Sequence, residues 1–177
     1  QMCIRDSWVT VARLLAAEAV ALQAQGAELA ILATNTVHLV AEQIQGSIDI
    51  PLLHIADVVA DAATAADCTR LGLVGTRFTM SRPFYADRLA GHGVGSLVPG
   101  PVDQELVDRI IFDELVVGRY TDRARTHLRR IMGDLHDRGA DGIALACTAL
   151  ELPVDATDSP VPLFASTALP VSAPCPL

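Results

Sequence analysis

The sequence predicts an α/β fold with parallel sheets, built as two similar units. Two observations carry this prediction. Helix-spaced apolar stripes alternate along the chain with short apolar runs of the kind found in buried parallel strands. In addition, one segment occurs twice, as GAELAILATNT in residues 26–36 and as GADGIALACT in residues 139–148. A chain that builds this unit twice is expected to face the two copies across one cleft.

Length, composition and charge narrow the class of protein. With 177 residues, 51% of them hydrophobic, the chain can bury a core as one domain or as two small lobes. A net charge of −8 without a basic run argues against nucleic acid and against an anionic membrane surface as partners. No apolar stretch reaches about 18 residues and no leader of signal-peptide type is present, so we expect neither a membrane span nor a signal peptide.

Cysteine spacing and sequence motifs limit which cofactors the chain is expected to bind. The four cysteines and five histidines show no metal-type spacing and no disulfide framework. We therefore expect no metal, and a reducing, cytoplasmic location. Neither GxGxxG nor GxxxxGK[ST] occurs, so a nucleotide cofactor is not expected either.

The two ends of the chain are set apart from the fold. Residues 1–7 (QMCIRDS) resemble a translated sequencing-adapter peptide that recurs at the ends of metagenomic reading frames, and we expect them to be an artefact. Residues 168–177 hold three prolines and cannot continue as a helix, so we expect an aberrant tail. The chain is thus expected to be a metagenomic fragment, truncated at both ends. Its first, incomplete lobe would span residues 8–55 and its second lobe residues 56–167.

The elements follow in order along the chain. In the first half, one-sided apolar spacing predicts a helix over residues 8–25, which Gly26 ends, and another from Ile55 to Ala66. Between them a strand, a helical turn or two and a second strand are predicted over residues 30–33, 39–45 and 50–53.

In the second half, residues 71–75 (LGLVG) give the clearest strand after the repeats. Ser81 is expected to cap a helix that has Pro83 in its first turn. The remaining predicted elements are a strand over residues 94–98, helices over 103–117 and 121–138, and strands over 143–146 and 161–164.

Chemically useful side chains follow the predicted strands. Thr34, Thr76 and Cys147 each stand at the carboxyl end of a strand, where open α/β sheets bind ligands. A thiol near a helix N-terminus and backbone N–H groups can have its pKa lowered toward a usable thiolate. The alternative is that Cys147 is a small buried hydrophobe. The Thr34 hydroxyl, a very weak acid, is expected to donate a proton or hold a water, or merely to cap the next helix.

Polar groups around these positions suit a carboxylate ligand. Asn35, Thr36 and Thr148 offer amide and hydroxyl groups beside freed backbone N–H groups, and Thr76 and Thr79 do the same from the neighbouring strand. Ordinary N-capping is the alternative role for each of them. Arg119 is either a fork-shaped donor to a substrate carboxylate or a solvated arginine at a helix end.

The chain resembles the aspartate/glutamate racemase family over nearly all of residues 8–169. In that family a Cys-Asn-Thr-x-His segment faces a Gly-Cys-Thr-Glu segment; here they stand as TNTVH in residues 34–38 and ACTA in residues 146–149. The stretches GTRFT, IFDEL and FAST, in residues 75–79, 111–115 and 164–167, also look like the family's.

The resemblance implies two flavodoxin-like lobes with the active site between them, and racemisation without a cofactor. By position, Cys147 would be the thiolate base and Thr34 the acid on the opposite face. Asn35, Thr36, Thr76 and Thr148 would bind the α-carboxylate of an amino acid, and Arg119 would lie near the place where relatives bind the side-chain carboxylate. A homodimer is compatible with the resemblance, because members of this family are often dimers.

The chain departs from the family in three places. Thr34 replaces the usual first Cys, as in a subgroup of the family, and the unlike pair predicts a one-sided exchange. We expect the family's amino-terminal strand with its loop to be missing, and Pro170 with a short tail to replace its terminal helix. Two alternatives stay open: a single-Cys relative of arylmalonate decarboxylase or maleate isomerase type, and an inactive α/β binding fragment.

Overall fold

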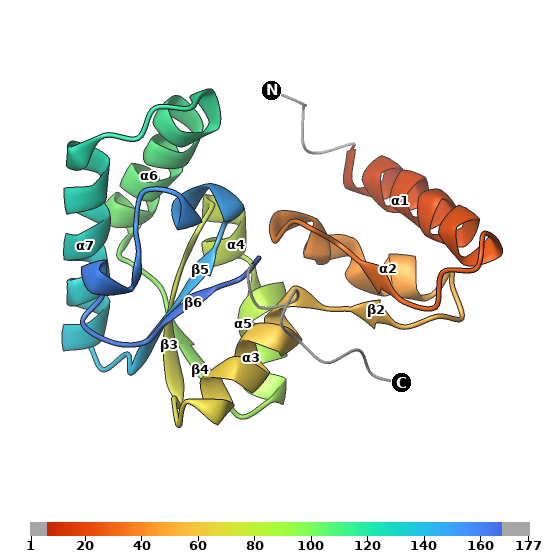
Figure 1. The fold of residues 1–177 in the computed structure, drawn as a ribbon, viewed down its shortest axis with the longest axis horizontal. Helices are drawn as coiled ribbons and strands as arrows, with labels where there is room; N and C mark the ends of the chain where they lie inside the picture. Colours follow the sequence, from red (N-terminus) through yellow and green to blue (C-terminus); the bar gives the residue numbers. More distant parts are fainter. Residues whose placement is uncertain (1–6, 168–177) are drawn as a thin grey trace. The chain divides into compact units, whose positions relative to one another are not determined.

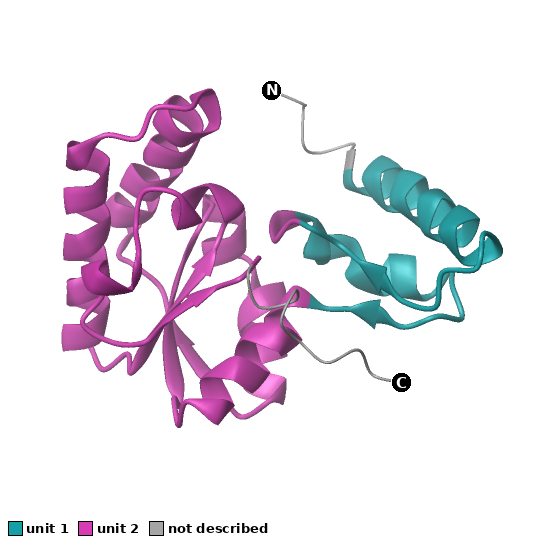
Figure 2. Ribbon diagram, viewed as in Figure 1, with its two compact units in different colours: residues 1–33, 37–54 teal, residues 34–36, 55–177 magenta. Residues whose placement is uncertain are grey.

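The computed structural model describes residues 7–167, and these residues divide into two compact units (Figure 2). Within the described residues, unit 1 holds residues 7–33 and 37–54, and unit 2 holds residues 34–36 and 55–167. The short segment 34–36 therefore packs with unit 2, although the residues on both sides of it belong to unit 1. The expected artefact and the expected tail lie outside the described residues, apart from Ser7.

Unit 1 is a small α/β layer. Its elements are α1 (Ser7–Ala24), β1 (Ala30–Ile31), the 3-10 turn η1 (Thr36–Val40, of which Thr36 belongs to unit 2), α2 (Ala41–Gln45) and β2 (Leu52–Leu53). The two strands pair in parallel, with Ala30 opposite Leu52. Apolar side chains of α1 and α2 pack on them around Ile44, which is almost fully buried.

Unit 2 contains a four-stranded parallel sheet with the order β4-β3-β5-β6 (Figure 1). Its strands are β3 (Arg70–Gly75), β4 (Gly95–Leu97), β5 (Gly142–Ala146) and β6 (Leu163–Ala165). Its α-helices are α3 (Ile55–Ala65), α4 (Arg77–Ser81), α5 (Pro83–Gly91), α6 (Pro101–Arg109) and α7 (Asp122–Asp137). The predicted α/β fold with parallel sheets is confirmed.

Helices cover both faces of this sheet, as the alternation of side chains along its strands requires. Val74 of β3 and Ile143 of β5 belong to the core formed with α6 and α7. Leu73 and Ala144, their neighbours along the strands, belong to the core formed with α3 and α5. Figure 1 shows these two helix layers on either side of the sheet. The central strands β3 and β5 are therefore buried on both faces, which explains their continuous apolar sequences.

The repeated segment builds the same local structure in each unit. Gly26 and Gly139 follow α1 and α7 with φ angles of 95° and 98°, left-handed values that favour glycine at a helix end. Four residues later, Ala30 pairs with the residue after Pro51, and its N–H donates to the Pro51 carbonyl at 2.9 Å. Ile143 makes the same 2.9 Å bond to Pro162. The sequence repeat is thus a structural repeat.

Two local predictions are wrong. Ser81 is the last residue of α4 and does not cap α5, because Arg82, which precedes Pro83, adopts an extended conformation, as proline requires of its predecessor. The helix predicted over residues 103–117 starts at Pro101 and then changes type. It passes through a π-helical turn, η2 (Ile110–Glu114), and a 3-10 turn, η3 (Leu115–Val117).

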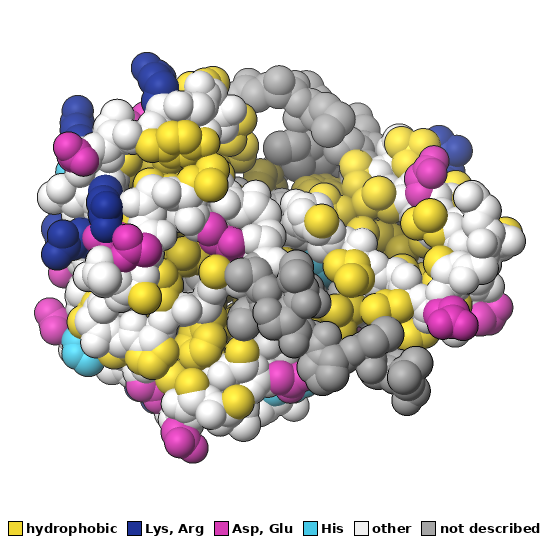
Figure 3. Space-filling view, in the orientation of Figure 1, with side chains coloured by type: hydrophobic (Ala, Val, Ile, Leu, Met, Phe, Trp, Pro, Cys, Tyr) yellow, Lys and Arg dark blue, Asp and Glu magenta, His cyan; other side chains and the backbone are white. Residues whose placement is uncertain are grey.

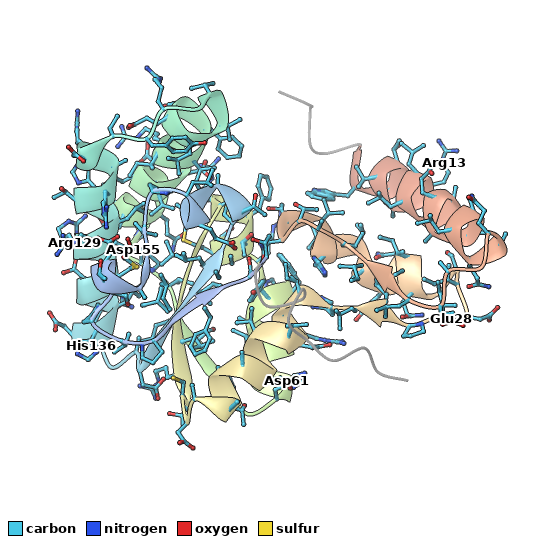
Figure 4. The ribbon with its side chains drawn as sticks, viewed as in Figure 1. Arg13, Glu28, Asp61, Arg129, His136 and Asp155 are labelled. Carbon is cyan, nitrogen blue, oxygen red and sulfur yellow. The ribbon has the colours of Figure 1, made fainter. Side chains whose placement is uncertain are left out.

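Charged side chains on the α7 side of unit 2 are interspersed in sign (Figure 3). Arg125 of α7 donates to Asp158 at 2.8 Å, and the Asp158 side chain is only 1% exposed. Burial alone would raise the pKa of Asp158, but hydrogen bonds from Arg125 and from the Asp155 backbone outweigh it and lower that pKa. Figure 4 labels Arg129 and Asp155 at this side of the unit. These contacts tie the loop after β5 to α7.

None of the helices in residues 7–167 has the length and apolar character needed to cross a membrane.

Candidate active site

The carboxyl ends of β3 and β5 bring two predicted site residues side by side. Gly75 and Ala146 are register partners, and Thr76 and Cys147 directly follow them. A Cβ atom at position 75 would lie 2.8 Å from the Ala146 carbonyl oxygen, so only glycine allows this close approach of the strands. The sheet register therefore places the backbones of Thr76 and Cys147 next to each other.

Cys147 is half-buried and lies between the end of β5 and a 3-10 turn, η4 (Thr148–Glu151). Burial raises the pKa of its thiol, and the negative charges of Glu151 and Asp108 raise it further. The backbone N–H groups of Ala149 and Leu150 favour the thiolate and act in the opposite direction, but they do not outweigh burial. The expectation that the pKa of this thiol is lowered is thus wrong. The thiolate-stabilising N–H groups that motivated it are nevertheless present.

Three predicted threonines form a cluster at the end of β3. The Thr76 hydroxyl lies 3.2 Å from both the Thr36 and the Thr79 hydroxyl, and Thr36 and Thr79 lie 3.5 Å apart. Thr76 also caps α4, accepting from the Thr79 N–H. The N-capping alternative is therefore confirmed for Thr76, and its role in ligand binding stays a prediction. Thr76 and Thr79 are buried, whereas Thr36 is half-buried.

A second polar group joins Asn35 to the ends of β5 and β6. The side-chain amide of Asn35 donates to the Ser166 hydroxyl at 2.8 Å, and Ser166 donates to the Glu151 carboxylate at 3.3 Å. Glu151 also accepts from the Thr167 backbone N–H at 2.9 Å and from the Thr167 hydroxyl. Asn35 is buried, yet its Oδ1 has no hydrogen-bond partner among the described residues.

Tyr85 of α5 lies close enough to Glu151 to feel its charge. It is fully buried in the core on that face, and its hydroxyl also has no partner within residues 7–167. Burial, and then the charge of Glu151, raise the pKa of this phenol. Two partnerless buried polar atoms, those of Asn35 and Tyr85, thus occur close to the Glu151 carboxylate or to the serine that it binds.

The remaining predicted residues are more exposed. Thr34 is exposed and belongs to the segment that packs with unit 2, and Thr148 is an exposed residue at the start of η4. Arg119 follows η3, is exposed, and donates to the Asp113 carbonyl within its own loop. No hydrogen bond among the described residues joins Arg119 to the threonine cluster or to Cys147. The structure therefore groups Asn35, the three clustered threonines and the strand end at Cys147, and leaves Arg119 apart.

Three residues near the site were missed from the sequence. Ser166 follows β6, so the rule that polar residues gather at the carboxyl ends of strands would have identified it. Glu151 stands four residues after Cys147, but the sequence carries no sign that its carboxylate turns back toward β6. Asp108, whose charge acts on Cys147, accepts from the Arg77 N–H at 2.9 Å and approaches from α6 through tertiary packing alone.

The fold and this arrangement define a class: an α/β protein of the racemase type. The chain belongs to the Asp/Glu/Hydantoin racemase family, whose sequence profile matches residues 2–173. A protein from Yersinia pestis that is assigned as an Asp/Glu racemase is 40% identical, with a TM-score of 0.88 over 93% of this chain and 72% of its own. An aspartate racemase homologue from Pyrococcus horikoshii is 32% identical, with a TM-score of 0.83 over 94% of this chain and 73% of its own.

More distant racemases share the fold. A glutamate racemase from Francisella tularensis, solved in complex with D-glutamate, is 17% identical, with a TM-score of 0.69 over 94% of this chain and 64% of its own. Family and fold together place the chain among racemases, which are isomerases.

Proposed function

We propose that the chain is a cofactor-independent racemase of aspartate- or glutamate-like amino acids, with Cys147 as the base and Thr34 as the acid on the opposite face. The observation that carries the proposal is the setting of Cys147. Cys147 directly follows the central strand β5, and the backbone N–H groups of Ala149 and Leu150 favour its thiolate. Thr76 holds the equivalent position after β3, because the last residues of the two strands are register partners. A thiol that can act as a base and hydroxyl groups that can bind a carboxylate thus lie at the same end of the sheet.

The chemical step needs only the chain's own groups. The Cys147 thiolate takes the α-proton, and the electrons of the broken C–H bond pass into the substrate carboxylate as an enolate. A proton then reaches the opposite face of the α-carbon from the Thr34 hydroxyl or from a water that this hydroxyl holds. Cys147 gains one proton and the Thr34 side loses one, and proton exchange with solvent restores both groups.

Ligand binding is assigned to the polar groups around this thiol. Hydroxyl groups of Thr36, Thr76, Thr79 and Thr148 would hold the α-carboxylate and stabilise the negative charge that develops on it, with Asn35 lining the same ligand site. Arg119 would bind the side-chain carboxylate as a fork donor, which requires its loop to release the Asp113 carbonyl. Substrate binding would thus rearrange the exposed loop more than the buried threonine cluster.

A thiol and a hydroxyl are unequal partners in proton transfer. Burial raises the pKa of the Cys147 thiol, but a thiol remains a far stronger acid than a hydroxyl. Removal of the α-proton by Cys147 is therefore expected to be faster than removal by the Thr34 side. The proposed exchange is one-sided in rate, while its equilibrium between the two enantiomers stays at unity.

Incubation in deuterated water tests the proposal. The full chain is mixed with each enantiomer of aspartate and glutamate, and α-deuterium is measured by mass spectrometry while optical rotation is followed. A racemase incorporates α-deuterium as rotation decays. Release of carbon dioxide from an arylmalonate, or conversion of maleate, would instead identify the single-Cys alternatives. No turnover of any of these compounds would mark an inactive binding fragment.

A further inference from the structure

The hydrogen bonds between Glu151, Ser166 and Asn35 run in one direction. Glu151 Oε1 accepts from the Thr167 backbone N–H, which can only donate. Because a carboxylate oxygen only accepts, Ser166 must use its single hydroxyl proton on the same Oε1 atom. The Ser166 oxygen is then left to accept, and it takes the Nδ2 group of Asn35 at 2.8 Å.

This direction decides which way the Asn35 amide faces. The two ends of an amide are similar in shape, and hydrogen bonding alone distinguishes them. With Nδ2 held by Ser166, Oδ1 occupies the other branch of the side chain, where it is buried and partnerless within the described residues. A buried acceptor without a donor destabilises the protein, so the site is prepared for a donor group.

We infer that Glu151 and Ser166 are positioning residues that fix the Asn35 amide with Oδ1 free, so that it accepts from the α-ammonium group of an amino-acid substrate. This inference rests on the proposed function. At neutral pH aspartate and glutamate carry one kind of donor, the α-ammonium group, and two carboxylates that only accept. An amide oxygen therefore suits the ammonium and repels either carboxylate. The Asn35 side chain thus has a different ligand partner from the threonine hydroxyls.

Three variants separate this role from simple structural support. Glu151→Met removes the acceptor while keeping an unbranched side chain of similar length. Ser166 is then free to donate to Asn35 Oδ1 once the amide turns over, which presents Nδ2 to the ligand. Ser166→Ala removes the intermediate group and leaves the contacts between Glu151 and Thr167 in place.

Glu151→Gln is the conservative variant that should restore the behaviour. Its amide oxygen can occupy the Oε1 position, where it accepts from both the Thr167 N–H and the Ser166 hydroxyl. Its NH₂ group then donates to the Thr167 hydroxyl. The direction of the hydrogen bonds is kept although the charge is lost. Direct attraction between the Glu151 charge and the ligand would instead make Glu151→Gln as defective as Glu151→Met.

A matched control is Asp141→Asn. The Asp141 carboxylate also binds a threonine twice, accepting from the Thr69 N–H and hydroxyl, both at 2.8 Å, and from the Arg70 N–H. It does so before β5 begins, at the opposite end of the strand from Glu151. Asp141→Asn should lower the melting temperature without changing ligand preference. It therefore shows what loss of stability alone does to binding.

Calorimetric titration with L-aspartate and with succinate, which lacks the ammonium, provides the binding readout. We expect Glu151→Met and Ser166→Ala to weaken aspartate binding about tenfold or more. Succinate affinity should change less than about threefold, and Glu151→Gln should match the wild-type chain. Equal losses for both ligands, or no loss for either, would overturn the inference.

A ligand-free readout keeps the inference separate from the proposed function. In amide NMR spectra, with the side-chain pair of Asn35 assigned through Asn35→Ala, wild-type protein and Glu151→Gln should protect one Nδ2 proton from exchange. Glu151→Met and Ser166→Ala should lose that protection. Unchanged protection in both variants contradicts the positioning role. If wild-type protein binds no aspartate while the protection pattern holds, the proposed substrate fails and the positioning of Asn35 stands.

Discussion

The hydroxyl of Thr36 lies 3.2 Å from that of Thr76, although the two residues come from separate parts of the chain. Thr36 closes the first copy of the repeated segment, and Thr76 follows the central strand β3. The contact explains why residues 34–36 pack with unit 2 while their neighbours in sequence pack with unit 1. The first copy of the repeat thus delivers its terminal polar residues to the sheet end that carries Cys147.

Thr79→Val tests the threonine cluster. Valine matches the shape of threonine, but it removes a fully buried hydroxyl that lies within 3.5 Å of the hydroxyls of Thr76 and Thr36. We expect the free energy of unfolding to fall by about 1 kcal/mol, with weaker aspartate binding, measured by urea denaturation and calorimetric titration. Thr126→Val on the exposed surface of α7 is the control and should change neither quantity. Unchanged aspartate affinity in Thr79→Val would remove the cluster from the binding site.

Gly75→Ala tests the close approach of β3 and β5. The added methyl group would meet the Ala146 carbonyl at 2.8 Å, where backbone must move. We expect a loss of about 1–3 kcal/mol in the free energy of unfolding, since overpacking forces backbone shifts. Gly91→Ala, at the end of α5 in open space, is the control and should be neutral or slightly stabilising. Equal stability of the two variants would show that the strand ends are not tightly packed.

The pH dependence of Cys147 alkylation follows from its environment. Burial raises the pKa of the thiol, so its thiolate fraction keeps growing as the pH passes the ordinary cysteine value of about 8.5. We expect the rate of iodoacetamide labelling at Cys147, followed by peptide mass spectrometry, to rise throughout that range. A rate that levels off below the ordinary value would contradict the buried, acid-flanked setting.

Asp108→Asn should accelerate this labelling. It removes one of the negative charges that raise the pKa of Cys147, while its amide oxygen still accepts from the Arg77 N–H. The lower pKa gives more thiolate at about pH 8, so the labelling rate at that pH should rise. Asp137→Asn, at the exposed end of α7, is the control and should leave the rate unchanged.

The fold was largely predictable because its signals are local. Apolar runs such as residues 71–75 identify buried strands, and Gly26 and Gly139 mark helix ends by the backbone angles that glycine allows. Local rules failed where two of them competed. Ser81 has the chemistry of a cap, but Pro83 forces an extended residue between them and gives Ser81 the last position of α4 instead.

The site was predictable only in part. Cys147, Thr76 and Asn35 stand at strand ends or beside them, which the α/β rule identifies. The direction in which a side chain turns depends on partners far along the chain, as with Asn35 and Ser166, which are separated by 131 positions. The sign of the Cys147 pKa shift likewise depends on burial and on Asp108 of α6, and the strand-end position shows only the opposing N–H groups.

Thr34→Cys tests the proposed asymmetry of proton transfer. A second thiol would give both faces of the α-carbon a group of similar acidity. We therefore expect the α-deuterium incorporation rates from the two enantiomers of aspartate to become more nearly equal than in the wild-type chain. Thr34→Ser keeps a hydroxyl and should keep the asymmetry. If Thr34→Cys leaves the ratio of the two rates unchanged, Thr34 is not the group opposite Cys147.

The most direct test of Cys147 as the base is α-deuterium exchange in the Cys147→Ala variant. Wild-type protein and the variant are incubated with aspartate in deuterated water, after circular dichroism has shown that both are folded. The proposed mechanism predicts that exchange falls at least about a hundredfold, the scale of a lost general base. Exchange within a few-fold of the wild-type rate would contradict it.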